Sequence, residues 1–231
     1  MSVLTVDDLS FELKPSSRRR TLQITVDRSG DLVLSAPPDV EEERLREFIL
    51  EKRFWIYTKL AEKDRLQKAV PTKSYVDGEG FLYLGRSYRL RLVDEQDVAL
   101  KLLNGRFLLR RDLVENARTH LVQWYSARAK LWLWDKVQDY VARMEVRPVG
   151  VKVQDLGYRW GSCGKGDWLY FHWKTILLPP RIAEYVVVHE LAHLHQPHHT
   201  PEFWQRVERA LPDFERRKIW LAEHGMDVEG I

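Results

Sequence analysis

The stretch VVVHELAHLHQPHHTPEFW, residues 186–204, holds five of the eight histidines in this chain of 231 residues. His189 and His193 stand in the order His-Glu-x-x-His, with Glu190 directly after the first histidine. Residues four apart on an α-helix are rotated by only about 40° and displaced by about 6 Å along the axis. The two imidazoles are therefore expected to point the same way and to share one metal ion.

Glu190 is the candidate general base beside this pair of histidines. On the predicted helix it stands beside them, where its carboxylate can reach a metal-bound water without ligating the metal. A bound zinc ion lowers the pKa of such a water from about 15.7 to roughly 7. Glu190 can then accept the proton and pass it to a leaving group. The pattern is typical of a metal-dependent hydrolase with a glutamate as general base.

The residues around the motif favour a helix. Residues 181–196, RIAEYVVVHELAHLHQ, carry a broad apolar surface, and Pro180 or Arg181 is expected in the first turn. Polar groups on a buried helix reduce stability unless they find partners. A metal ion would partner both histidines, so we interpret the motif as a metal site and not as a core histidine pair.

A catalytic zinc site usually takes a third protein ligand. His195 lies about 200° around the helix from His193, so a surface or capping role is favoured for it. Pro197 ends the helix, and Thr200-Pro201-Glu202 predicts an N-cap and first turn of a second helix. The turn between the helices leaves several residues open as the third ligand. The candidates are His198, His199, Glu202, Glu208 and Glu215.

The rest of the chain predicts short strands and two long helices. Residues 21–37 alternate apolar and polar side chains around Arg28-Ser29-Gly30-Asp31 and indicate a hairpin. Residues 39–70 predict a helix that Pro71 ends. Residues 81–93 and 98–111 predict more strands, with Asn104-Gly105 as a tight turn. No internal repeat is visible.

The second half of the chain predicts a long helix and a small sheet. The helix is expected over residues 113–145, with Asp112 as N-cap and Glu115 as its capping-box partner. Residues 151–175 predict two or three short strands, with a hairpin turn at Gly164-Lys165-Gly166-Asp167. Together these segments predict an α+β fold, with a β-rich region and one long helix over residues 1–111 and a second domain over 112–231.

Composition limits the classes of protein. Hydrophobic residues are 44% and charged residues 31% of the chain, which is ordinary for a soluble globular protein. No apolar run approaches the roughly 20 residues that span a bilayer, and Asp7, Asp8, Glu12 and Lys14 argue against a secretory segment. Cys163 is the one cysteine, which excludes an internal disulfide and a zinc ribbon. We expect a cytoplasmic protein without a membrane partner.

Residues 158–204, YRWGSCGKGDWLYFHWKTILLPPRIAEYVVVHELAHLHQPHHTPEFW, closely resemble the YgjP-like metallopeptidase family, which is related to the SprT-like proteases. That family has an Arg-Trp-Gly-Ser-Cys element, a strand, a proline, Tyr-Val-Val-x-His-Glu-Leu-x-His-Leu, and His-[Ser/Thr]-x-x-Phe-Trp. These elements stand here at residues 159–163, 185–194 and 199–204. The resemblance covers essentially the whole chain.

The resemblance implies the details of the site. It implies that His189, His193 and His199 bind one zinc ion and that Glu190 is the catalytic base. It also implies a zincin-like catalytic domain over residues 112–231, with the long helix, a short antiparallel sheet and the His-Glu-x-x-His helix. The fold class remains α+β.

Two further residues are candidates for binding substrate. His172-Trp173 stands where the family usually has Asn-Trp, so His172 is a candidate for contacting substrate or an oxyanion. Its alternative is a strand histidine at the rim of the sheet. Arg159 is a candidate for binding substrate or a carboxylate, and its alternative is a structural ion pair. Trp160 and Cys163 are interpreted as packing residues.

The favoured function is a zinc-dependent metallopeptidase that acts on a peptide or protein. An edge strand such as WLYFHW, residues 168–173, would pair with the extended substrate. The alternative is a metal-dependent hydrolase of a non-peptide substrate such as a nucleotide phosphoanhydride. The basic residues considered for its phosphates are Arg106, Arg110, Arg111 and Arg159, but the chain lacks a phosphate-loop pattern. The net charge of +3 leaves a nucleic-acid partner open.

Overall fold

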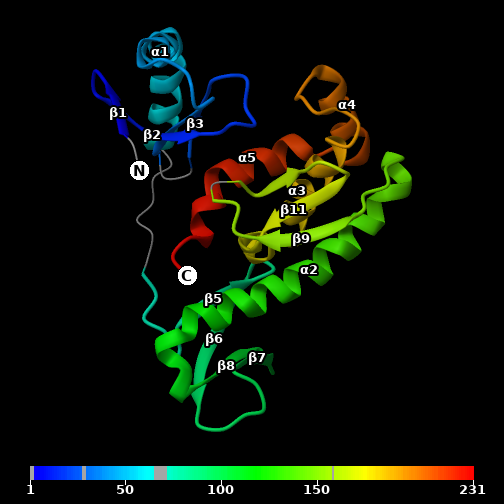
Figure 1. Cartoon of the computed structure of the whole chain (residues 1–231). Helices are drawn as coiled ribbons and strands as arrows, with labels where there is room; N and C mark the ends of the chain where they lie inside the picture. The colour runs from blue at the N-terminus through cyan, green and yellow to red at the C-terminus, as the bar shows by residue number, and fades with distance from the viewer. Residues whose placement is uncertain (1–2, 28–29, 65–71, 158) are drawn as a thin grey trace. The chain divides into compact units, whose positions relative to one another are not determined.

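The computed structural model describes residues 3–27, 30–64, 72–157 and 159–231 (Figure 1). The chain forms two compact units, residues 1–69 and 70–231. The predicted domain boundary after residue 111 therefore falls inside the second unit. No helix among the described residues is both long enough and apolar enough to cross a bilayer.

The first unit is a four-stranded sheet followed by one helix. Its strands are β1 (Val3–Val6), β2 (Leu9–Pro15), β3 (Gln23–Val26) and β4 (Leu32–Ala36). They run in the order β1-β2-β4-β3, with a parallel pair in the middle and an antiparallel pair on each side. The predicted hairpin over residues 21–37 is confirmed as β3–β4; residues 28 and 29 of its turn lie outside the described residues.

The predicted N-terminal helix is confirmed as α1 (Glu42–Asp64). Its buried residues Leu45, Ile49 and Ile56 pack with Phe11 and Leu34 of the sheet in one apolar cluster. The spacing of the three helical residues places them on one face of the helix. The predicted end of this helix at Pro71 lies outside the described residues.

The second unit begins with a sheet of the same arrangement. Its strands are β5 (Gly80–Tyr83), β6 (Arg86–Val93), β7 (Leu100–Leu103) and β8 (Arg106–Arg110). Their order is β5-β6-β8-β7, again with a parallel pair flanked by antiparallel ones. The predicted tight turn is confirmed, because Asn104 and Gly105 have φ of +48° and +73° between β7 and β8. The structure thus repeats a topology whose repetition is not visible in the sequence.

The long helix begins later than predicted. Residues Arg111–Asn116 form a 3₁₀ turn, η1, and α2 spans Ala117–Met144. The predicted capping box at Asp112 and Glu115 is wrong, because the Asp112 carboxylate instead pairs with the Arg110 guanidinium at 2.5 and 3.0 Å. The buried residues of α2 recur mostly every four positions and form one stripe. They are Ala117, Leu121, Tyr125, Ala129, Leu133, Val137, Tyr140 and Met144.

The third sheet lies beside the second half of α2. It contains β9 (Gly150–Gln154), β10 (Gly161–Cys163) and β11 (Trp168–His172), in the order β10-β11-β9. The hairpin β10–β11 is antiparallel, with Gly164 N donating to Trp168 O at 2.8 Å across the predicted turn. The pair β9–β11 is parallel, so the prediction of a purely antiparallel sheet is wrong.

The predicted edge strand is also wrong. Residues 168–172 form the central strand β11, because the chain crosses from β9 to the far side of the sheet before it returns. The two edges of this sheet are β9 and β10. Of these, β10 is the edge that packs against the helix carrying the His-Glu-x-x-His motif.

Three helices complete the second unit: α3 (Pro180–Ala192), α4 (Pro201–Ala210) and α5 (Phe214–His224). Between β11 and α3 lies the 3₁₀ turn η2 (Trp173–Leu177), and η3 (Gly225–Val228) follows α5. The predicted first-turn prolines of α3 and α4 are confirmed at Pro180 and Pro201. Helix α3 packs against α2, α4, α5 and β10, so it is enclosed on several sides.

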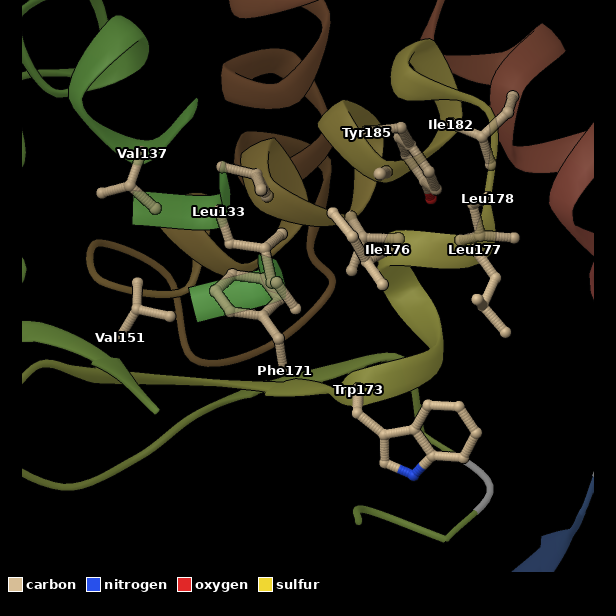
Figure 2. Close-up of a cluster of buried hydrophobic side chains, with 14 of the residues drawn as sticks. Leu133, Val137, Val151, Phe171, Trp173, Ile176, Leu177, Leu178, Ile182 and Tyr185 are labelled. Atoms are coloured by element: carbon tan, nitrogen blue, oxygen red, sulfur yellow. The ribbon is translucent and has the colours of Figure 1, made fainter. Parts of the chain in front are cut away.

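One apolar core joins these parts of the second unit. Figure 2 shows Leu133 and Val137 of α2 near Val151, Phe171 and residues of η2 and α3. The same core includes Phe81, Leu90 and Phe107 of the β5–β8 sheet. Because of this shared core, the β5–β8 sheet packs with residues 112–231. The sequence had predicted these strands as part of the N-terminal region.

Candidate metal centre

Helix α3 carries the first half of the candidate site. Its apolar residues are buried on several faces, which holds the helix in a fixed orientation. The helix ends at Ala192, four residues before the predicted end, and His193 follows with φ −65° and ψ −20°. Because these are helical angles, His193 keeps the direction it would have on a continued helix. His189 and His193 therefore lie on one side, with ring centroids 5.0 Å apart.

The second half of the site comes from the start of α4. Thr200 is its N-cap residue and Pro201 its first residue, so His199 directly precedes the helix. The His199 ring lies 4.9 Å from that of His189 and 4.8 Å from that of His193, between centroids. Among the described residues, these three histidines form a group whose potential ligand atoms all lie within 4.8 Å of one another.

The three imidazoles fit a metal ion. Two nitrogen ligands of a tetrahedral zinc ion lie roughly 3.4 Å apart, given Zn–N distances of roughly 2.0–2.1 Å. Here Nε2 of His199 lies 3.0 Å from Nε2 of His189. Nδ1 of His193 lies 3.0 Å from the Gln196 carbonyl oxygen, and donation to it leaves Nε2 with a free lone pair. His189 Nδ1 is buried without a hydrogen-bond partner among the described residues.

Burial keeps these histidines in the form that binds metal. It lowers the pKa of His189 to about 3, helped by the neighbouring His193, His199 and Lys218. Burial also lowers the pKa values of His193 and His199. Neutral imidazoles keep a lone pair at neutral pH, so the cluster offers ligands to a cation.

Aromatic side chains enclose the histidine cluster. Phe203 is fully buried, and its ring centroid lies 4.6 Å from that of His193 and 5.0 Å from that of His189. Trp204 stacks on His199 at 5.6 Å with an interplanar angle of 22°. Both aromatic residues lie on α4, which explains why Phe-Trp follows His199 so closely in the sequence. Such packing fixes the ring orientations and keeps water away from one side of the cluster.

Glu190 follows His189 directly on α3 and faces β10. Its side chain is buried, and burial raises its pKa to about 8; the charge of Arg159 and a hydrogen bond from the Cys163 backbone N–H act against this increase. The carboxylate lies directly over Gly161. A Cβ atom at that glycine would lie 2.6 Å from both Cγ and Oε1 of Glu190.

Gly161 is therefore a close neighbour of the candidate base that sequence reasoning missed. Any side chain at this position would collide with the candidate base, so the glycine makes the approach of α3 to β10 sterically feasible. The available signal was a glycine inside a strand, which often marks a close approach of another group.

Arg159 and His172 have different surroundings. The Arg159 charge acts on Glu190, and its Nη1 lies 3.5 Å from Ser162 Oγ. His172 is buried at the end of β11, where Nδ1 accepts from the Lys174 N–H at 3.0 Å and caps η2. Its Nε2 lies 3.3 Å from Asp155 Oδ1. Both ring nitrogens thus have partners within the protein, and a role in substrate binding stays a prediction for both residues.

The other histidines of the stretch lie apart from the cluster. His195 Nε2 lies 3.1 Å from the Met144 carbonyl oxygen, at the last residue of α2. It is exposed and partners a carbonyl that α2 leaves unpaired, which agrees with the predicted surface or capping role. His198 is exposed and does not belong to the group of three.

Comparisons with known proteins identify the family of the chain. A family model described as "YgjP-like, metallopeptidase domain" matches residues 20–224. Among solved structures, the crystal structure of the metallopeptidase zymogen of Pyrococcus abyssi abylysin is 26% identical, with a TM-score of 0.35. That match covers 38% of this chain and 86% of the other. No curated protein matches. Because the family model spans most of the sequence, the chain belongs to the YgjP-like family of metallopeptidases.

Proposed function

We propose that the chain is a zinc-dependent metallopeptidase in which His189, His193 and His199 hold one zinc ion and Glu190 is the general base. The observation that carries this proposal is the group of three neutral imidazoles, together with a buried carboxylate on the residue that follows His189. Three nitrogen ligands suit zinc and leave a coordination position for chemistry. When bound, zinc would polarise the scissile carbonyl and make water acidic enough to react near neutral pH.

Glu190 would move the proton in this reaction. Its carboxylate would take a proton from the attacking water and later give it to the leaving amine. The surroundings of Glu190 suit a group that must both accept and release a proton, because burial raises its pKa to about 8 while Arg159 and the Cys163 N–H favour the charged form. Arg159 would thereby help Glu190 to remain a base.

The edge strand β10 would bind the peptide. It pairs with β11 on one side only. On its other side the Cys163 N–H already donates to Glu190, so an extended substrate would pair with the remaining backbone groups of that side. Gly161 of β10 lies against Glu190, and a peptide paired along this strand would therefore run past the base. This assignment replaces the strand 168–173, which is central in its sheet.

The decisive experiment compares wild type with Glu190→Gln. The purified proteins would be analysed for bound metal and screened against a peptide library with and without a chelator. We expect the variant to retain its zinc and to lose hydrolysis by at least a hundredfold, because one proton acceptor is removed without touching the ligands. Hydrolysis at the wild-type rate in Glu190→Gln would contradict the mechanism.

The ligand set is tested by a matched pair of adjacent histidines. His199→Ala should lose most of the bound zinc, whereas His198→Ala should retain it, because His198 lies outside the cluster. Metal content after dialysis at a fixed free zinc concentration measures both. Loss of zinc in His198→Ala with retention in His199→Ala would reverse the assignment.

A further inference from the structure

A concentration of positive charge lies far along the chain from the candidate metal ligands, on the outer face of the β5–β8 sheet. Along β6, Arg89 and Arg91 alternate with the buried Leu90 and therefore project from the opposite face. Arg106 of β8 is the registered neighbour of Arg89 in the parallel pair. Neighbouring strands lie about 4.8 Å apart, so the sheet presents three guanidinium groups close together.

These arginines line a solvent-open hollow of about 590 Å³. Arg111 also borders it, and Asp77 is the acidic residue in its lining. Four arginines against one aspartate give the lining a formal charge of +3. Sites for small ligands commonly have volumes of about 300–1,000 Å³, so the hollow is large enough for a ligand with more than one charged group.

Two of the four arginines lack a partner among the residues that the structure describes. Arg111 pairs with Asp94 Oδ1 at 2.9 Å, and Arg89 donates to the Gly78 carbonyl oxygen at 2.8 Å. In the part of the chain that the structure describes, Arg91 and Arg106 form neither a hydrogen bond nor an ion pair. Guanidinium groups remain charged at all physiological pH values. Their mutual repulsion would be relieved by a bound anion.

The topology of the sheet does not require these charges. The β1–β4 sheet has the same strand order, and its buried Phe11 and Leu32 form a registered pair like Leu90 and Phe107. Aligned on these pairs, the positions of Arg89, Arg91 and Arg106 are taken in the first sheet by Ser10, Glu12 and Asp31. At the three equivalent positions, the first sheet thus has one serine and two acidic residues where the second sheet has three arginines. The arginine cluster is therefore a property of the second sheet alone.

We propose that this hollow is a phosphate-binding site in which Arg91 and Arg106 bind the anion. A guanidinium group offers parallel N–H donors that match two phosphate oxygens. The formal charge of the lining suits a multiply charged anion, such as two adjacent phosphate groups, better than a single carboxylate. The adjacent phosphates would belong to a soluble diphosphate compound or to a nucleic-acid backbone. The proposal is independent of zinc and of peptide hydrolysis.

The test is a binding titration of the full chain at constant ionic strength. The probes are inorganic pyrophosphate, a short single-stranded DNA oligonucleotide, and polyglutamate as a carboxylate polymer. Constant ionic strength is needed because exposed charges are screened by salt. We expect wild type to bind a phosphate probe, and Arg91→Gln and Arg106→Gln each to weaken that binding at least fivefold. Pyrophosphate and DNA distinguish the two sources of phosphate.

Arg86→Gln is the matched control, because Arg86 is an exposed arginine on the same strand and lies outside the lining. It should alter binding by less than twofold. If Arg86→Gln weakened phosphate binding as much as Arg91→Gln and Arg106→Gln, the loss of affinity would follow from net charge alone. That result would overturn the proposal. Undiminished binding in Arg91→Gln and Arg106→Gln would place the phosphate elsewhere, for example at the metal centre. Failure of wild type to bind either phosphate probe, or tighter binding of polyglutamate, would also overturn it.

Discussion

The two four-stranded sheets share one topology and differ in what they are attached to. In each, two hairpins are joined through a parallel central pair, and a long helix follows. The core of β1–β4 with α1 contains residues of the first unit only. The core of β5–β8 continues through α2 into the sheet and helices that carry the metal centre. The same arrangement of strands therefore forms a separate unit with α1 in one case. In the other case it shares a core with the elements that carry the candidate metal centre.

The difference between the two sheets is visible at one turn. The turn between β5 and β6 is bound to η2, with Leu84 N–H donating to Ile176 O at 2.8 Å and Gly85 N–H to Leu177 O at 3.1 Å. Gly85 also lies against Pro179, the residue before α3. The second sheet thus contacts the residues that lead into α3, the helix that carries His189 and Glu190.

The strongest test of this comparison is a matched pair of core truncations. Phe11 and Phe107 are both fully buried, one in each core. Replacement of a buried Phe by Ala lowers stability by about 3–5 kcal/mol. We expect Phe107→Ala to destabilise the second unit and to reduce bound metal, because the damaged core is continuous with α3. Urea unfolding and metal content would be measured together.

Phe11→Ala should leave the metal centre intact. Eight of the nine tryptophans lie in residues 70–231, so tryptophan fluorescence reports mainly on the second unit. The variant should lose circular dichroism signal at low urea while the fluorescence transition and metal content stay at wild-type values. Loss of metal in Phe11→Ala would mean that the two cores are not independent.

The same comparison explains what the sequence could predict. The His189–His193 pair was predicted because its spacing is local and helical. The fold class, most strands and the helical segments were predicted for the same reason, since alternation and periodicity are short-range signals. His199 was reached only with the family resemblance, because residues 194–198 change direction and the spacing left His198 and three glutamates open.

Most of the features that were missed depend on contacts between distant residues. The contact of Gly161 with Glu190 joins residues 29 positions apart, and no local pattern reports it. The central position of β11 depends on the path of the chain between β9 and β10. The predicted domain boundary after residue 111 differs from the division between the compact units for a similar reason. Alternation in residues 81–110 indicates strands without indicating which core they enter. The predicted cap at Asp112 is absent for a local reason, because the Arg110 guanidinium binds the carboxylate that would have capped the helix.

A smaller effect on stability is expected when one partner of an ion pair is removed in either unit. In the second unit, Arg217 of α5 is 11% exposed; its Nη1 lies 2.5 Å from Glu184 Oε2 of α3 and 2.8 Å from Arg181 O. Removing one partner of a largely buried pair leaves the other charge unpaired, so Arg217→Ala should lower the free energy of unfolding by about 2–3 kcal/mol. Urea unfolding followed by tryptophan fluorescence measures this loss.

The control for Arg217 is an exposed pair in the first unit. Arg44 and Glu47 of α1 are each 60% exposed and lie 2.9 Å apart. Exposed pairs typically contribute roughly 0–1 kcal/mol, so Arg44→Ala should change the stability of its unit by less than about 0.5 kcal/mol. An Arg217→Ala variant as stable as wild type would show that the Arg217–Glu184 pair does not contribute to holding α5 to α3.

The most specific effect concerns the turn that distinguishes the second sheet. Gly85 and Gly105 both have φ of +73°, but a Cβ at Gly85 would lie 2.7 Å from Pro179 Cα, whereas one at Gly105 would meet nothing within 4 Å. Alanine in this conformation costs about 1–2 kcal/mol. Gly105→Ala should show only this strain. Gly85→Ala should lose about 1 kcal/mol more, since its methyl group must displace backbone, and should reduce peptide hydrolysis by shifting the start of α3. Equal stability and equal hydrolysis in the two variants would mean that the β5–β6 turn touches α3 without positioning it.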